Sequence, residues 1–195
     1  MRKYKLIGLT GTTGAGKGQV RKIFESQGYV SVDADFLARK ITENPVVLKT
    51  LCCHFGDDVL ENNELNRKLL ASRAFKDKEH TRLLNSITHP FITALFIKEI
   101  EKISKNADRI IFDAPQLFES HLNAICDVTV AVTADRDIRI KRIINRDNIS
   151  RETAQKRINA QYSDSFFADN CDYIIENNGD LETLKTTTLE IISRI

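Results

Sequence analysis

The chain has 195 residues, 42% of them hydrophobic and 29% charged, which is typical of a soluble globular protein with one compact core and insertions. The net charge of +2 argues against a general nucleic-acid binder, which usually carries a large basic excess. No apolar run approaches the ~20 residues that a membrane span needs, and the start MRKYKLIGLTG lacks the apolar segment of a signal peptide.

The first predicted elements are a strand, a loop, a helix and a second strand. The apolar pattern predicts a short buried strand at residues 4–10, a helix at 17–27 and a second strand at 29–32, which delivers Asp33 and Asp35 at its end. This opening predicts a parallel sheet.

The alternation of strands and helices stops after this unit. Residues 36–105 are predicted to be almost entirely helical, with Pro90 interrupting the long stretch 78–103, so we expect a helical insertion. The alternation then resumes with predicted strands at 109–113, 128–133 and 172–176, and predicted helices at 136–146, at 150–162 and after the Asn178-Gly179 turn.

A glycine-rich loop between the first strand and the first helix has the spacing of a Walker A motif. Glycines let backbone N–H groups wrap around phosphate oxygens, and the helix points the positive end of its dipole at them. Lys17 then reaches the β- and γ-phosphates. A turn without a ligand is the alternative, but three glycines and a lysine at these offsets have no packing purpose. The candidate ATP-binding residues here are Gly11, Thr12, Thr13, Gly14, Ala15, Gly16, Lys17, Gly18 and Gln19.

The position after the lysine departs from the usual motif. Gly18 stands where Ser or Thr normally supplies a hydroxyl to Mg²⁺. Adenylate-kinase-type loops also place Gly there, and Mg²⁺ readily keeps several waters and uses the phosphates themselves. Asp113 ends an apolar strand as a Walker B carboxylate does, so it is the candidate metal ligand. A strand-terminal capping role explains its position equally well.

Two aspartates follow the second strand, at the carboxyl edge where ligands collect in open α/β sheets. We expect them to face the phosphate loop, where a carboxylate can accept the proton of an attacking hydroxyl. An Asp after a strand is more often a helix N-cap, and Asp35 fits that role well whereas Asp33 fits it less well. Asp33 is therefore the predicted base.

Basic residues crowd the predicted helix at 136–146. Arg139, Arg142 and Arg146 share one face by their spacing. Arginines on a mobile lid can meet the charge that builds on the phosphates in the transition state, whereas exposed basic faces usually mean only solubility. The clustering favours a functional role, with Arg142 and Arg146 as the preferred pair.

Motifs along nearly the full length resemble those of the dephospho-CoA kinase family. They are LTGTTGAGKG, VDADFLAR, LNRKLLASRAF, ITHP, FDAPQLFES, KRIINRD, RINAQ and IIENNG, in the order of the family. The resemblance implies a P-loop NTPase α/β/α fold with a five-stranded parallel sheet. It implies transfer of the ATP γ-phosphate, with Mg²⁺, to the ribose 3′-hydroxyl of 3′-dephospho-CoA. The implied parts are a nucleotide-binding core at 1–35, 106–135 and 166–195, a helical CoA-binding domain at 36–105 and a lid at 136–165.

The resemblance also implies roles for single residues. Asp33 would be the base at the 3′-hydroxyl, with Lys17 and Arg142 acting at the transferred phosphate. Arg142 and Arg146 would contact ATP, and Asn177 would lie near the adenine. The acceptor-binding residues would be Thr10, Asp33, Arg67 and His89. The expected protein is cytoplasmic, a monomer or weak homo-oligomer, and binds ATP and 3′-dephospho-CoA but neither nucleic acid nor membrane.

Two other interpretations stay open. A nucleoside monophosphate kinase shares the loop and lid, and Gly18 favours it slightly, but it lacks the Asp33-Ala34-Asp35, HP and NNG set in this order. A degenerate nucleotide-binding protein, with Gly18 as the lesion, is opposed by the retention of Lys17, Asp33 and the arginines. Turnover with dephospho-CoA against AMP or CMP decides between the two kinases, and nucleotide binding without turnover would support the degenerate protein.

Overall fold

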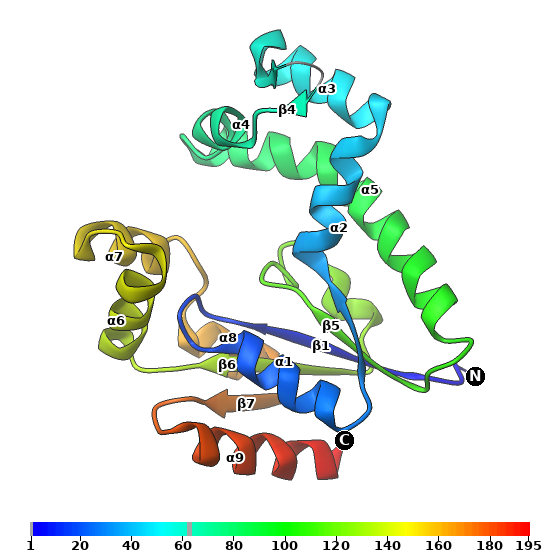
Figure 1. The fold of residues 1–195 in the computed structure, drawn as a ribbon, viewed down its shortest axis with the longest axis vertical. Coiled ribbons are helices and arrows are strands. Elements are labelled where there is room, and N and C mark those ends of the chain that lie inside the picture. The colour runs from blue at the N-terminus through cyan, green and yellow to red at the C-terminus, as the bar shows by residue number, and fades with distance from the viewer. Residues whose placement is uncertain (1, 62–63) are drawn as a thin grey trace. The chain divides into compact units, whose positions relative to one another are not determined.

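A five-stranded sheet forms the centre of the part of the chain that carries the glycine-rich loop (Figure 1). Its strand order is β2-β5-β1-β6-β7, and β1 pairs in parallel with both β5 and β6. The computed structural model describes residues 2–61 and 64–195. The chain divides into two units, Met1–Val32 with Lys102–Ile195, and Asp33–Glu101. The predicted α/β class with a five-stranded parallel sheet is confirmed.

The elements of the sheet and its helices are β1 (Lys5–Gly11), α1 (Lys17–Ser26), β2 (Val30–Asp33), β5 (Arg109–Asp113), η3 (Leu122–Ile125), β6 (Val128–Thr133), α6 (Arg136–Asp147), α7 (Arg151–Asn159), α8 (Asp164–Asn170), β7 (Tyr173–Glu176) and α9 (Leu181–Arg194). The predicted strands at 109–113 and 128–133 are confirmed at both ends. The C-terminal boundary of the helix predicted at 150–162 is wrong. α7 stops at Asn159, and a separate helix begins where the Ser163 hydroxyl accepts the Phe166 N–H at 3.2 Å.

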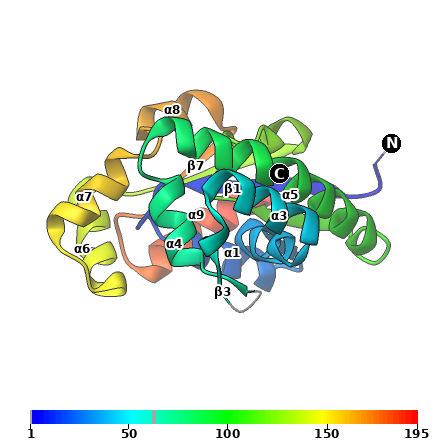
Figure 2. The same cartoon turned by 90° about the horizontal axis from the view of Figure 1, so that it is seen from above.

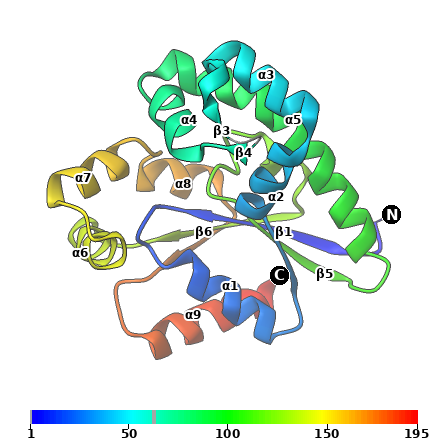
Figure 3. The same ribbon diagram turned by 45° about the horizontal axis from the view of Figure 1, so that its top comes forward.

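The central strand β1 is apolar and almost entirely buried, and it has a paired strand on each side. In its register Ile7 pairs with Ile111 and Val128. Helices α1 and α9 pack together on one face of the sheet, and α8 lies on the other (Figure 3). Burial on both faces explains the near-continuous apolar runs of these strands. Fully buried core side chains include Ile7, Leu9, Phe24, Ile111, Val130 and Val132.

Helices α6 and α7 form a pair beyond the carboxyl ends of the strands, at the end of the sheet where the glycine-rich loop leaves β1 (Figures 1 and 2). The pair has a small apolar core of its own, made by Ile140, Ile143, Ala154 and Ile158. This core is separate from the core of the sheet, so α6 and α7 are stabilised mainly by their packing against each other.

The unit Asp33–Glu101 is mostly helical, as predicted. Its elements are α2 (Ala34–Lys40), η1 (Ile41–Glu43), α3 (Pro45–Phe55), η2 (Asp57–Val59), β3 (Leu60–Glu61), β4 (Glu64–Leu65), α4 (Arg67–Ala74) and α5 (Lys78–Ile103), of which α5 continues two residues past the boundary of the unit. The antiparallel pair of β3 and β4 was not predicted. The core of this unit includes Leu51, Phe55, Val59 and Ile87.

The predicted interruption at Pro90 is wrong, because α5 continues through this residue. A proline inside a helix removes one backbone hydrogen bond and favours a kink, but it does not remove the packing of the flanking turns. Ile87 is buried and Phe91 packs against the same core. The apolar contacts on both sides therefore keep the helix in one piece. Within residues 2–61 and 64–195, no helix has the length and apolar character to cross a membrane.

Candidate active site

The glycine-rich loop runs from the end of β1 to the start of α1, as the Walker A spacing predicts. Gly11, Gly14 and Gly16 all have positive φ angles, of 141°, 80° and 99°. A Cβ at Gly11 would clash with the backbone of Val132, and one at Gly16 would clash with Asn177 Nδ2. Both the conformation and the close approach of neighbours therefore require glycine.

Side chains from distant elements fix the outer side of this loop. The carbonyl of Ala15 accepts hydrogen bonds from Asn177 Nδ2 at 2.7 Å and from Arg142 Nη1 at 3.4 Å. The backbone N–H of Thr13 donates to Gln161 Oε1 at 2.7 Å. Because Ala15 and Asn177 are both buried, the bond between them is shielded from water. The three bonds together hold the shape of the loop.

Asp113 lies beside the loop at the carboxyl end of β5. Its Oδ1 accepts from the Lys17 ammonium, and its Oδ2 accepts from Arg21 Nη1 at 3.1 Å. The side chain of Asp113 is only 8% exposed, so the two cations compensate a largely desolvated carboxylate. These described partners are cationic side chains, which fits a carboxylate at a phosphate site better than a capping residue.

Three of the four arginines of α6, those that share one face by their spacing, have different environments. Arg142 reaches the loop and also donates to the carbonyl of Asn177 at 3.0 Å. Arg139 is buried and pairs with Asp164 at 2.9 Å, so it connects α6 to α8. Arg146 is exposed and pairs with Asp147 at 2.7 Å, and this hydrogen bond lowers the pKa of the Asp147 carboxyl. Of the predicted pair, the structure brings Arg142 and not Arg146 to the loop.

Asp33 is the N-cap of α2, and this corrects the sequence prediction that Asp35 fits the capping role better. Asp33 Oδ1 accepts the N–H groups of Asp35 at 2.8 Å and Phe36 at 3.2 Å. Asp35 instead lies in the first turn of the helix. The argument that preferred Asp33 because it was the poorer cap was therefore wrong, whereas its role as a base stays a prediction.

The other predicted acceptor residues lie in different parts of the chain. Thr10 is buried in β1, and its hydroxyl donates to the carbonyl of Pro115 at 3.4 Å. Arg67 and His89 belong to the unit Asp33–Glu101. Arg67 begins α4 and donates to the Thr42 hydroxyl at 2.7 Å, and His89 lies half-buried on α5.

The residues near the loop offer few oxygen ligands for Mg²⁺. In the described part of the chain, no cluster of three or more His, Cys, Asp or Glu side chains is able to hold a metal ion. Gly18 has no hydroxyl, and Asp113 is the carboxylate beside the loop. These residues fit an ion that keeps several waters and takes its other ligands from nucleotide phosphates, which is the usual behaviour of Mg²⁺.

Two residues that contact the site were not singled out from the sequence. Arg21 lies one helical turn after Lys17, and this spacing was the available signal. Gln161 lies in RINAQ, and its contact to the loop could not be inferred from the motif.

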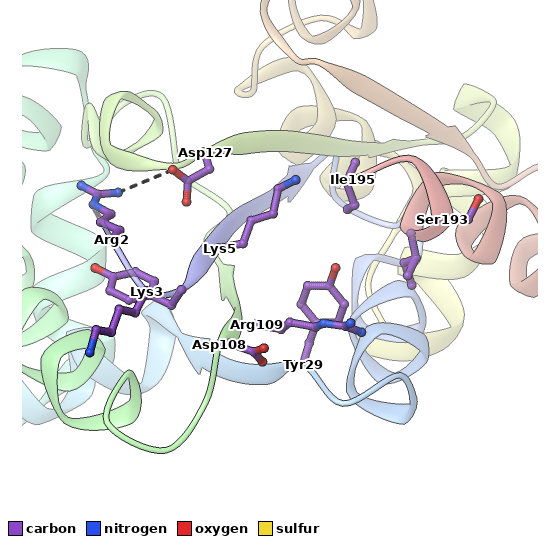
Figure 4. Close-up of a pocket in the computed structure, with 11 residues that line it drawn as sticks. Arg2, Lys3, Lys5, Tyr29, Asp108, Arg109, Asp127, Ser193 and Ile195 are labelled. Carbon is purple, nitrogen blue, oxygen red and sulfur yellow. Dashed lines mark ion pairs between the residues drawn. The ribbon is translucent and has the colours of Figure 1, made fainter.

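A pocket of ≈ 860 Å³ lies at the opposite end of the sheet (Figure 4). Its lining includes Lys5 and Arg109, the first residues of β1 and β5, so it opens at the amino ends of the strands. Arg109 lies 6.0 Å from the centre of the Tyr29 ring. None of the predicted site residues lines this pocket, so it is separate from the phosphate loop.

Comparisons with known proteins identify relatives over nearly the whole chain. The family model for dephospho-CoA kinase matches residues 5–183. A dephospho-CoA kinase from Listeria innocua is 37% identical over 193 residues, which cover 97% of this chain and 96% of the relative. The crystal structure of a Thermus thermophilus protein, 28% identical, matches with a TM-score of 0.84 over 98% of both chains. A dephospho-CoA kinase from Campylobacter jejuni, 22% identical, shares the fold, with a TM-score of 0.63 over 98% of this chain and 97% of that one.

Proposed function

Because the chain belongs to the dephospho-CoA kinase family and is thus an ATP-dependent kinase, we propose that it phosphorylates the ribose 3′-hydroxyl of 3′-dephospho-CoA to give CoA. The observation that carries this proposal is the phosphate loop, whose glycines are conformationally required and whose Lys17 is paired at the carboxyl end of β5. Phosphoryl transfer depends mainly on positioning and on compensating negative charge, and this loop supplies both.

The nucleotide side of the reaction uses groups in the phosphate loop and α6. Backbone N–H groups of the loop bind the phosphate oxygens, and Lys17 moves to the β- and γ-phosphates. Arg142 adds positive charge beside the loop, where it also holds the Ala15 carbonyl. Arg146 contacts ATP from the same helix when its pair with Asp147 opens, and Asn177 lies near the adenine.

The acceptor side of the reaction uses the carboxylate of the last residue of β2. Asp33 accepts the proton of the 3′-hydroxyl as that oxygen attacks the γ-phosphorus. Thr10, Arg67 and His89 bind the rest of the acceptor. The helical region 36–105 would then bind the CoA moiety, and the segment 136–165 would act as the lid over the nucleotide.

We also propose Mg²⁺ as the metal ion of the reaction, which when bound would lower the negative charge of the nucleotide phosphates. Asp113 is the residue that would hold it, directly or through water. We further propose that the protein works in the cytoplasm as a monomer or weak homo-oligomer, with no nucleic-acid or membrane partner.

A substrate-panel kinase assay tests the function. Purified protein is given ATP and Mg²⁺ with dephospho-CoA, AMP or CMP, and ADP formation is measured together with the phosphorylated product. We expect turnover with dephospho-CoA and CoA as its product. Preferential turnover of AMP or CMP would support the nucleoside monophosphate kinase, and ATP binding without turnover on any acceptor would support the degenerate protein.

The substitution Gly18→Ser is expected to lower the Mg²⁺ concentration needed for half-maximal activity. A Cβ at Gly18 meets nothing within 4 Å, so serine fits and places a hydroxyl where the usual motif binds Mg²⁺. One added oxygen ligand should strengthen Mg²⁺ binding about threefold to tenfold, since a hydrogen-bond-sized gain is about 1 kcal/mol. Kinase activity is measured against free Mg²⁺ at saturating ATP.

Gly18→Ala is the matched control for this substitution. It adds the Cβ and, like serine, favours a helix more than glycine does, but it has no hydroxyl. We expect the Mg²⁺ dependence of the alanine variant to equal that of the unsubstituted protein. Equal effects of serine and alanine would show that the backbone, and not the hydroxyl, determines the change.

A further inference from the structure

Helix α1 presents two cations to one carboxylate. Lys17 and Arg21 are four residues apart and therefore lie on the same face of the helix. They bind different oxygens of Asp113, Lys17 at Oδ1 and Arg21 at Oδ2. The carboxylate side chain is 8% exposed, whereas that of Arg21 is 26% exposed. The buried charge of Asp113 thus has two partners, and one of them is the lysine of the phosphate loop.

Arg21 is itself held in place from the other side. Its Nε lies 3.6 Å from Glu25 Oε1, one turn further along α1. The same Glu25 oxygen accepts from the Ser31 hydroxyl at 2.6 Å. A continuous series of polar contacts therefore runs from β2 through Glu25 and Arg21 to Asp113, and it fixes where the guanidinium can lie.

Binding of a nucleotide requires the Lys17 ammonium to change its partner from a carboxylate to a phosphate. If Lys17 were the sole cation on Asp113, its departure would leave a desolvated negative charge without compensation, which is strongly unfavourable. The carboxylate would then compete with the phosphates for the lysine. A second cation on Asp113 removes this penalty, because the carboxylate stays paired after the lysine has left.

We propose that Arg21 is a positioning residue for the kinase reaction, which keeps Asp113 charge-compensated so that Lys17 can move to the nucleotide phosphates. The proposal rests on the proposed function only in taking the loop as the nucleotide site. It assigns Arg21 no contact with the substrate. Arg21 acts through Asp113. Its substitution should therefore change the affinity for ATP even when no acceptor and no metal ion are present.

The test measures ATP binding by isothermal titration calorimetry in the presence of EDTA. Arg21→Ala should raise the dissociation constant about tenfold, and Arg21→Lys, which keeps the charge, should restore most of the affinity. Lys22→Ala is the matched control, since it removes a positive charge from an exposed site on the same helix. It should change the affinity less than twofold. Thermal melting of each variant verifies that it is folded.

A double-mutant cycle with Asp113→Asn distinguishes the proposed route from general electrostatic attraction. Asparagine has no charge to compete for Lys17, so Arg21→Ala should cost no further affinity in that background. An equal loss in both backgrounds, or no loss in the first, would overturn the proposal. Glu25→Gln gives a milder variant, with a smaller rise in the dissociation constant expected. Normal ATP binding without turnover of dephospho-CoA would contradict the proposed function and leave this inference standing.

Discussion

Replacing Lys17 with alanine is expected to lower kcat by about 10²–10³-fold, as the loss of one preorganised charge at a developing anion does in other enzymes. The ammonium is the mobile cation of the phosphate loop, and its place beside Asp113 shows that its amine end reaches the carboxyl edge of the sheet. The loss should fall mainly on kcat, because charge builds on the transferred group in the transition state. Initial rates with ATP and dephospho-CoA measure it.

The fold should survive the Lys17 substitution, because Asp113 keeps its hydrogen bond from Arg21. The melting temperature therefore separates a chemical defect from an unfolded protein. Lys22→Ala, on the exposed side of the same helix, is the control and should retain normal kcat. If the Lys17 variant turned over at the normal rate, the loop would not be the site of phosphoryl transfer.

Those parts of the fold with strong local signals were predictable from the sequence. The strand at 109–113 is a continuous apolar run that ends in Asp113, and its bounds were predicted correctly. The loop at 11–17 combines glycines and a lysine at fixed offsets, and its positive φ angles agree with that pattern. In both places the local sequence pattern was sufficient to predict the element.

Other features depend on tertiary contacts that no local pattern encodes. Pro90 does not end α5, because apolar packing in its own unit outweighs the lost hydrogen bond. The bond of Gln161 to the Thr13 N–H joins residues 148 positions apart in the chain. Arg139 lies on the same predicted helix face as Arg142, but its side chain is buried and pairs with Asp164. Helical periodicity predicted that these arginines lie on one face of the helix, but it could not predict which of them would reach the loop.

Asp33→Asn is expected to lower kcat by about 10²–10⁴-fold, which is the usual contribution of a general base. The cap geometry makes this substitution unusually informative. Asparagine caps helices about as well as aspartate, so it can still accept the N–H groups of Asp35 and Phe36. The substitution removes the basic carboxylate and keeps the start of α2. Steady-state rates with dephospho-CoA and thermal melting are measured on the same preparation.

Two further variants decide between a chemical and a structural role for this residue. Asp33→Ala loses the cap as well as the base, so it should be less stable than the asparagine variant by about 1 kcal/mol and equally inactive. Asp35→Asn changes a carboxylate in the first turn of the same helix and should retain normal turnover. Near-normal activity of Asp33→Asn would refute the choice of base, and loss of activity in Asp35→Asn alone would move that role to Asp35. A third outcome is that kcat falls in proportion to melting temperature across all three variants. Asp33 would then act through the helix that it caps, because the loss of a base lowers kcat even when the cap is intact.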